Sequence, residues 1–287
     1  MDVLLTNDDG IDATGLRALR EALEEVADVT VAAPAADQSA VGRAMSSEVT
    51  IDERPDGFAV HGTPVDCVVA GTQALDLDPD LVVAGCNRGA NLGGYTLGRS
   101  GTVSAAVEAA FFDVPAIAVS LYFPGTDVRY QEFDPDVPAY AEAARATRYL
   151  VAHAPDAGVF EHADYLNVNA PLPPEYDSDG SDDSDSLDGS DDSDSLDDSD
   201  GPESETHAPM TVTRPSHVYR IDAERDGDSV VIHDRIWEMM AEGTIPDPPG
   251  TDRRAVVEGE VSVTPLAAPH TTEHHEALDG LIAAYDG

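Results

Sequence analysis

Short apolar runs alternate with helical patterns through the first 125 residues, and this alternation constrains the fold more than any other feature. Four of the runs are predicted to be buried strands, at 3–6, 28–33, 81–84 and 116–121. Repeated β-α units with apolar strands form parallel sheets that are covered on both faces. We therefore expect an α/β fold with an open, mostly parallel sheet and helices on both faces.

Local patterns predict the first helices and a hairpin. A helix from Thr14 would carry one apolar face, made of Leu16, Leu19, Leu23 and Val26. The run Thr63-Pro64-Val65-Asp66 combines a capping Thr, a Pro at the first helical position and an acid in the first turn, as helix starts do. Alternating residues at 48–53 and 58–61 flank a turn sequence and predict a β-hairpin.

An acidic segment interrupts this pattern at 177–207. Its nonapeptide GSDDSDSLD at 180–188 recurs unchanged at 189–197, and the segment holds 14 acids and no Arg or Lys. Such a composition cannot bury enough apolar surface to offset the entropy lost on ordering. We therefore expect a disordered insert.

The insert divides the chain into a core at 1–176 and a C-terminal extension at 208–287. In the core, a helix at 138–154 and a strand at 165–170 continue the α/β pattern. The extension is predicted to hold strands at 210–213, 218–223, 230–236 and 261–264, and a last helix at 272–285. We expect it to complete the domain and to provide a smaller β-rich region for oligomerisation.

The charge balance is extreme, with 57 acidic residues against 15 basic ones and a formal net charge of −42. Without the insert 43 acids remain, so the acidity runs through the whole chain. Such a surface repels nucleic acid and anionic membranes. It is typical of adaptation to a salt-saturated cytoplasm, and the alternative is a protein with cationic partners.

The cysteines and the N-terminus indicate where the protein works. Cys67 and Cys86 lack CxxC spacing, which favours a reducing compartment. The opening residues lack the basic and apolar regions of a signal peptide, and no apolar run approaches the ~18 residues of a membrane span. We expect a cytoplasmic protein.

Oxygen-bearing side chains gather in the loops after three predicted strands. The loops contain Asn7-Asp8-Asp9-Gly10, Asp37-Gln38-Ser39-Ala40 and the glycine-rich run 85–94. Ligands of open α/β sheets bind beyond the carboxyl ends of the strands, so the loops should meet. Carboxylate, hydroxyl and amide oxygens suit Mg²⁺ or Mn²⁺ better than zinc. Taken alone, Asp8-Asp9 fits an Asp-Asp-Gly turn equally well.

The run Arg99-Ser100-Gly101-Thr102-Val103-Ser104 precedes a helix of small residues, predicted from about Thr102. Free amides and hydroxyls at a helix N-terminus form a phosphate-sized anion site. A capped helix that packs closely on the sheet explains the run equally well. Dinucleotide-binding and P-loop motifs are absent from the sequence.

Three further groups carry weaker indications. Trp237, Met239 and Met240 suit core packing better than a base-stacking surface, and Cys86 suits a small loop filler better than a nucleophile. A zinc site is a minor alternative at His270, His274 and His275.

Ordered motifs resemble the SurE family, the stationary-phase survival nucleotidases. The matching runs are LLTNDDGIDATGL, VAAPAADQSAVG, GTPVDCVVAG, DLVVAGCNRGANLG, SGTVSAAVEAA, YLNVNAP and TDRRAVVEGEVSVTPL. The resemblance spans nearly the whole chain outside the insert. It implies a Rossmann-like fold and a homodimer or homotetramer joined through a C-terminal hairpin.

The resemblance also implies an activity: metal-dependent hydrolysis of nucleoside 5'-monophosphates and 3'-monophosphates. It implies one divalent cation, Mg²⁺ or Mn²⁺, held by Asp8, Asp9, Ser39 and Asn87. Asn91 would lie at the phosphate, in a pocket lined by Ser100, Gly101 and Thr102. The expected catalytic residues are Asp8, Asp9 and Asn91. Alternatives are a short-chain exopolyphosphatase on the same site and a non-catalytic nucleotide-binding protein.

Several residues depart from the family pattern around the pocket. Gln38 stands where an Arg is common, Ala90 where a Pro is common, and Gly94-Tyr95 where acids are frequent. Arg99 stands where an aromatic residue or His is frequent, and it could supply a cation to the phosphate. These departures leave the proposed metal ligands intact and put substrate preference in doubt.

Overall fold

A computed structural model describes residues 1–124, 133–174, 176 and 207–268. Nine strands form one sheet in the order β3-β4-β2-β1-β5-β6-β7-β11-β8. Their bounds are β1 Asp2–Thr6, β2 Asp28–Pro34, β3 Ile51–Arg54, β4 Gly57–Val60, β5 Leu81–Arg88, β6 Ala116–Tyr122, β7 Tyr165–Pro171, β8 Met210–Val212 and β11 Val261–Leu266. The six strands from β4 to β7 in this order run parallel, whereas β3, β11 and β8 run the opposite way. The expected Rossmann-like, mostly parallel sheet is confirmed.

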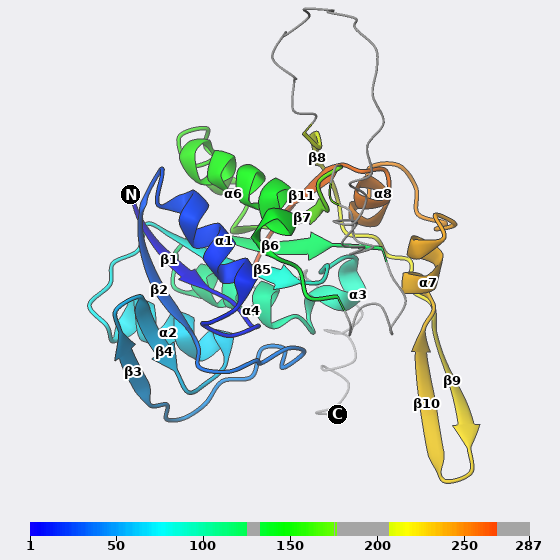
Figure 1. Ribbon diagram of the computed structural model, residues 1–287, viewed down its shortest axis with the longest axis horizontal. Coiled ribbons are helices and arrows are strands. Elements are labelled where there is room, and N and C mark those ends of the chain that lie inside the picture. The colour runs from blue at the N-terminus through cyan, green and yellow to red at the C-terminus, as the bar shows by residue number, and fades with distance from the viewer. Residues whose placement is uncertain (125–132, 175, 177–206, 269–287) are drawn as a thin grey trace, which may run out of the picture.

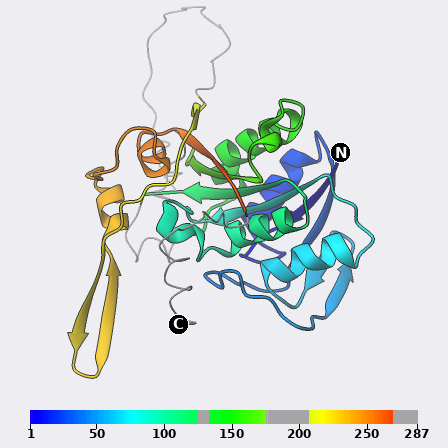
Figure 2. The same cartoon turned by 180° about the vertical axis from the view of Figure 1, so that it is seen from behind.

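Helices cover both faces of the sheet. The longer ones are α1 Thr14–Leu23, α2 Pro64–Gln73, α4 Gly101–Phe111 and α6 Ala141–His153. Helices α1 and α6 pack together on one face, and α2 and α4 pack together on the other (Figure 1, Figure 2). Short helical segments connect them: α3 Gly94–Leu97, η1 Val137–Tyr140, η2 Val159–Glu161, α7 Ile236–Ala241 and α8 Asp252–Val257.

Alternation along the strands divides the core into two large clusters. Leu5 and Val83 belong to the cluster beneath α1 and α6. Leu4 and Val82 belong to the cluster beneath α2 and α4. Successive side chains of a strand point to opposite faces, so a sheet covered on both sides needs strands that are apolar throughout.

Four details of the predicted elements were wrong. Helix α1 ends at Leu23 because the chain turns there to enter β2, and Val26 lies beyond it with 38% of its surface exposed. Strand β3 begins at Ile51 and not at residue 48. The strand expected at 218–223 begins at Ile221, because the Val218 carbonyl accepts a hydrogen bond from the Arg253 guanidinium of α8 instead. Ile236 begins α7 and is not in a strand, since the Asp234 carboxylate accepts its backbone N–H.

The C-terminal extension has two parts. Strands β8 and β11 complete the main sheet. The sequence predicted a strand at 210–213 but did not place it in this sheet. Strands β9 Ile221–Asp226 and β10 Ser229–Asp234 form a separate antiparallel hairpin, here called the arm, which projects from the body (Figure 1). The expected C-terminal hairpin is therefore present.

Two predicted regions, nearly all of the insert and the helix at 272–285, lie outside the described residues. Within the described part of the chain, no helix has the length and apolar character needed to cross a membrane.

Candidate active site

Asp8 follows β1 and lies against the N-terminus of α4. The Thr102 hydroxyl donates to Asp8 Oδ1 at 2.6 Å, and the Thr102 backbone N–H donates to Oδ2 at 3.2 Å. A Cβ on Gly101 would meet Asp8 Cβ and Oδ2 at 2.9 Å, so only glycine fits there without a shift. The positive end of the helix dipole thus faces a carboxylate of the protein itself.

The surroundings of the adjacent Asp8 and Asp9 carboxylates disfavour their ionised forms. Burial, and then the neighbouring Asp9, raise the pKa of Asp8 to about 6, against the opposing hydrogen bonds from Thr102. Burial also raises the pKa of Asp9, whose Oδ2 accepts the Arg88 backbone N–H at 2.9 Å. A nearby cation would relieve both effects.

Ser39 and Asn87 come to the same place from β2 and β5. The Gln38 backbone N–H donates to the Asp8 carbonyl at 2.7 Å and ties the second loop to the first. Ser39 donates its backbone N–H and its hydroxyl to Asp37 Oδ1, at 2.7 and 2.6 Å. Asn87 follows a break in the β5–β6 register and donates its amide to the Gly89 carbonyl at 2.5 Å. Both donors are engaged locally, which leaves oxygen lone pairs for a ligand.

Asn91 is fixed by the neighbouring strands. Its backbone N–H donates to Asn169 Oδ1 at 2.8 Å, and its side-chain amide donates to Ser120 Oγ at 2.9 Å. The amides of Asn167 and Asn169 both donate to its carbonyl, at 2.9 and 3.1 Å. Ser120 and Asn169 are register partners on β6 and β7, so the sheet itself positions this loop.

A cavity of about 420 Å³ opens at this edge of the sheet. Five of the expected site residues line it together: Asp8, Ser39, Asn87, Asn91 and Ser100. Asp9, Gly101 and Thr102 are not in the lining. Thr102 is fully buried behind Asp8, and Ser100 caps α4 by accepting the Val103 N–H at 3.0 Å. The hydrogen-bond donors at the start of α4 are therefore largely taken up by Asp8 and by the capping residue Ser100.

The donor set fits a hard divalent cation. A buried carboxylate, Asp8, and a half-buried one, Asp9, both with raised pKa values, accompany a hydroxyl and an amide oxygen, and all four donors are oxygens. Within the described residues, no three His, Cys, Asp or Glu side chains are grouped closely enough to hold a metal. The side chains that could hold a cation here are the mixed set expected from the sequence, Asp8, Asp9, Ser39 and Asn87. The three histidines of the zinc alternative lie outside the described residues.

The pocket rim is built around Arg99. Its guanidinium lies 4.2 Å from the centroid of the Tyr95 ring and donates to the Tyr95 hydroxyl at 2.6 Å. Tyr95 in turn stacks on Tyr219, with ring centroids 5.7 Å apart. Arg99 also lines the cavity, as do Ala90 and Thr96. Two of the positions that depart from the family pattern, Tyr95 and Arg99, thus form one stacked group.

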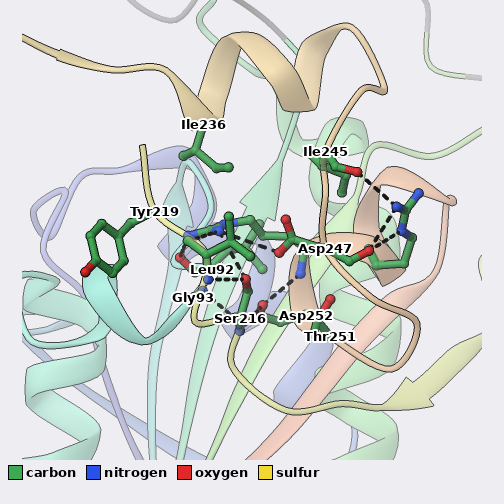
Figure 3. A network of polar contacts seen from close by, with 12 residues as sticks. Leu92, Gly93, Ser216, Tyr219, Ile236, Ile245, Asp247, Thr251 and Asp252 are labelled. Atoms are coloured by element: carbon green, nitrogen blue, oxygen red, sulfur yellow. Dashed lines mark hydrogen bonds and ion pairs between the residues drawn. The ribbon is translucent and has the colours of Figure 1, made fainter. Parts of the chain in front are cut away.

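The C-terminal extension holds the loop that carries Asn91 (Figure 3). Asp252 Oδ2 accepts the Gly93 N–H at 2.7 Å, and its Oδ1 accepts the N–H groups of Ser216 and Arg253 at 2.9 and 2.8 Å. Gly94 donates to the Ser216 carbonyl at 2.8 Å. The buried Arg253 guanidinium lies 3.6 Å from Asp247 Oδ1. We call Asp252, Arg253 and Ser216 the clamp.

Sequence reasoning missed the clamp and part of the pocket wall. Asn167 and Asn169 carried a usable signal, because two amides on one face of an otherwise apolar strand must find buried partners. Asp252 also carried a usable signal, because it is an acid at a helix start beside two arginines. Tyr122 and Phe123 carried none, since an aromatic residue at a strand end is ordinarily core.

Comparisons with known proteins point to one family. The family model described as Survival protein SurE matches residues 3–185. Proteins called 5'-nucleotidase SurE are 64% identical in Natronomonas pharaonis, covering 99% of this chain and 100% of the relative, and 59% identical in Haloarcula marismortui, covering 99% and 95%. The crystal structure of the SurE protein from Aquifex aeolicus matches with a TM-score of 0.68 at 27% identity, over 100% of both chains.

Several of these similar relatives come from halophilic archaea, in agreement with the acidic composition expected of a salt-adapted protein. The family model matches well over half of the chain, and the two named relatives match almost end to end. The chain belongs to the SurE family.

Proposed function

We propose that this protein is a divalent-metal-dependent phosphohydrolase that releases phosphate from nucleoside 5'-monophosphates, and also from 3'-monophosphates. The observation that carries the proposal is that Asp8, Ser39, Asn87, Asn91 and Ser100 line one cavity. Relatives named 5'-nucleotidase SurE, at up to 64% identity, support the choice of substrate.

Asp8, Asp9, Ser39 and Asn87 are the proposed holders of one Mg²⁺ or Mn²⁺. When bound, such a cation polarises a phosphoryl oxygen and lowers the pKa of a water molecule. Either carboxylate can accept a proton from that water when it does not itself contact the cation.

Asn91 is the proposed phosphate donor. Its backbone is fixed by three hydrogen bonds from β7, so its side chain is preorganised when negative charge develops on the phosphoryl oxygens. Ser100 lines the cavity beside it and adds a hydroxyl.

The test is phosphate release by wild type and Asp8→Asn, measured in molar salt with and without a chelator. The substrates are a panel of 5'- and 3'-mononucleotides and short polyphosphates. We expect mononucleotide hydrolysis that needs added Mg²⁺ or Mn²⁺ and is lost in Asp8→Asn, while its circular dichroism matches wild type. The control is Asp12→Asn, since the Asp12 side chain is 75% exposed and forms a surface ion pair with Arg54.

Other outcomes select the alternatives. Preferential release from polyphosphate identifies an exopolyphosphatase on the same cavity. Nucleotide binding without phosphate release identifies a non-catalytic binding protein. Full turnover by Asp8→Asn with excess cation would contradict the proposed active site.

We also propose that the arm joins subunits into a dimer or tetramer. Every residue of β9 is exposed, and β10 exposes Val230, Val231 and Ile232, the last at 71%. A projecting hairpin with apolar residues on its surface suits pairing with another copy of the chain.

A further inference from the structure

We propose that Trp237 is the platform on which the nucleobase of the substrate stacks. This inference rests on the proposed nucleotidase function and assigns the part of the cavity that the phosphate and the cation do not use. It concerns a residue contributed by the C-terminal extension and not by the β-α units that supply the chemistry.

The cavity has one apolar wall in addition to its oxygen-bearing residues. Ala90, Tyr122 and Trp237 all line the cavity. The same three residues belong to one hydrophobic cluster with Leu92 and Met240, so they lie on the same side. A cavity of about 420 Å³ also exceeds what a phosphate group fills and falls in the range of small-molecule sites.

Trp237 is the member of this wall with an aromatic face to offer. Tyr122 and Phe123, the other aromatic residues of the lining, are 7% and 9% exposed, so little of either ring reaches the cavity, and Ala90 has only a methyl group. Trp237 is half-buried: it packs against the cluster and also borders the cavity. An indole that is held by the core and open on the ligand side suits offset stacking with a planar base.

The helix that carries Trp237 holds it in place. Ile236 and Met240 anchor α7 with 1% and 2% exposure, and the Asp234 carboxylate accepts the Ile236 N–H at 3.2 Å. Arg235 donates its backbone N–H to the Arg220 carbonyl at 2.8 Å across the root of the arm. Stacking on a pre-positioned ring loses less conformational entropy than stacking on a free side chain.

The chemistry of the wall predicts which ligands it recognises. Stacking uses the π-face that every base has and reads no hydrogen-bonding edge, so the site should accept all four bases. Larger purine rings overlap the indole more than pyrimidines do, so we expect AMP and GMP to be preferred modestly over CMP and UMP. A neutral base is also not repelled by a protein with a net charge of −42.

The kinetic test compares a substrate with a base and one without. For Trp237→Ala we expect kcat/KM for AMP to fall roughly 5- to 100-fold, through KM, while kcat/KM for ribose 5-phosphate stays unchanged. Trp237→Phe should retain part of the AMP preference. Met239→Ala is the matched control, because Met239 packs against the same cluster from α7 and does not line the cavity.

A binding test is available because Trp237 is the only tryptophan in the sequence. Adenosine has no phosphate to be released, so it can be titrated with Mg²⁺ present, and it should quench this fluorescence, whereas ribose 5-phosphate and inorganic phosphate should not. Wild-type protein is used throughout, so a poorly folded variant does not affect this result.

Two results would overturn the proposal. One is an equal loss of kcat/KM for AMP and ribose 5-phosphate in Trp237→Ala, which indicates a packing role. The other is fluorescence that does not respond to adenosine. If wild type hydrolyses neither substrate, the nucleotidase proposal fails by itself, and the fluorescence titration still decides whether the base site exists.

Discussion

Two regions of the molecule meet at the cavity, and they contribute to it differently. The β-α units of residues 1–124 supply the oxygen-bearing side chains, each within a few residues of a strand end or a helix start. The described part of the extension, 208–268, supplies Trp237 and the clamp from segments beside an exposed arm. In our proposals the core carries out the reaction, and the extension selects which part of a substrate fits beside it.

The largest effect on activity is expected at Gly101, which lies in the core against Asp8. Gly101→Ala places a methyl group 2.9 Å from Asp8 Oδ2, so the carboxylate must move. Displacement of a reacting group by about 1 Å costs roughly 100-fold in rate, and we expect kcat/KM to fall by about that factor. Gly98→Ala is the control, because a Cβ at Gly98 meets nothing within 4 Å. Full activity in Gly101→Ala would mean that the position of Asp8 is not critical.

The clamp gives the next largest effect. Asp252→Asn replaces an accepting oxygen by an N–H₂ group that faces backbone N–H donors, so we expect the free energy of unfolding to fall by about 2–3 kcal/mol. Activity should fall as well, because the loop with Asn91 loses its support. Denaturant unfolding and phosphate release measure the two effects. Glu258→Gln, with a 56% exposed side chain just after the same helix, should change stability by less than about 0.5 kcal/mol.

The pH dependence of cation binding tests the core alone, because the extension contributes none of the proposed cation ligands. A cation binds the Asp8 carboxylate and not its protonated form, and the pKa of Asp8 is raised to about 6. Below pH ~6 protons therefore compete, and the Kd for Mn²⁺ should rise about tenfold per pH unit. Titration calorimetry across this range measures the slope. The slope should be shallower in Asp8→Asn and unchanged in Trp237→Ala, and an identical slope in Asp8→Asn would remove Asp8 from the ligand set.

The smallest effect on the folded subunit is expected in the arm. Ile232→Glu changes a side chain that is 71% exposed, so the unfolding of a subunit should change by less than about 0.5 kcal/mol. Sedimentation should nevertheless show a shift toward monomers if the arm joins subunits. Wild-type protein that sediments as a monomer at assay concentrations would contradict the proposed assembly.

The core was predictable from the sequence because its signals are local. A capping Thr63 with Pro64 and Asp66 does begin α2, with the reciprocal cap hydrogen bonds in place. Apolar runs became the central strands because both faces of the sheet are covered. Val26 was misplaced because a periodic pattern does not report where the chain turns.

The extension was less predictable because its contacts are long-range. Gly93 and Asp252 are 159 residues apart, and a single sequence gives no sign that they meet. For Trp237 the sequence favoured packing over a base-stacking surface; the ring does pack against the hydrophobic cluster, and our proposal gives its other side the role that was ranked second. Likewise, the phosphate site expected at 100–102 did not account for Asp8 reaching the same helix start from 94 residues away.

The contact between Asp8 and the start of α4 has a consequence for the sequence of events during turnover. Because Thr102 gives its amide and hydroxyl to a carboxylate of the protein, the helix has little positive potential left for an incoming phosphate. A phosphate dianion that arrives first meets the Asp8 carboxylate, whereas one that arrives after the proposed cation meets a neutralised site. If the proposed cation site is correct, nucleotide therefore binds more tightly after the cation than before it.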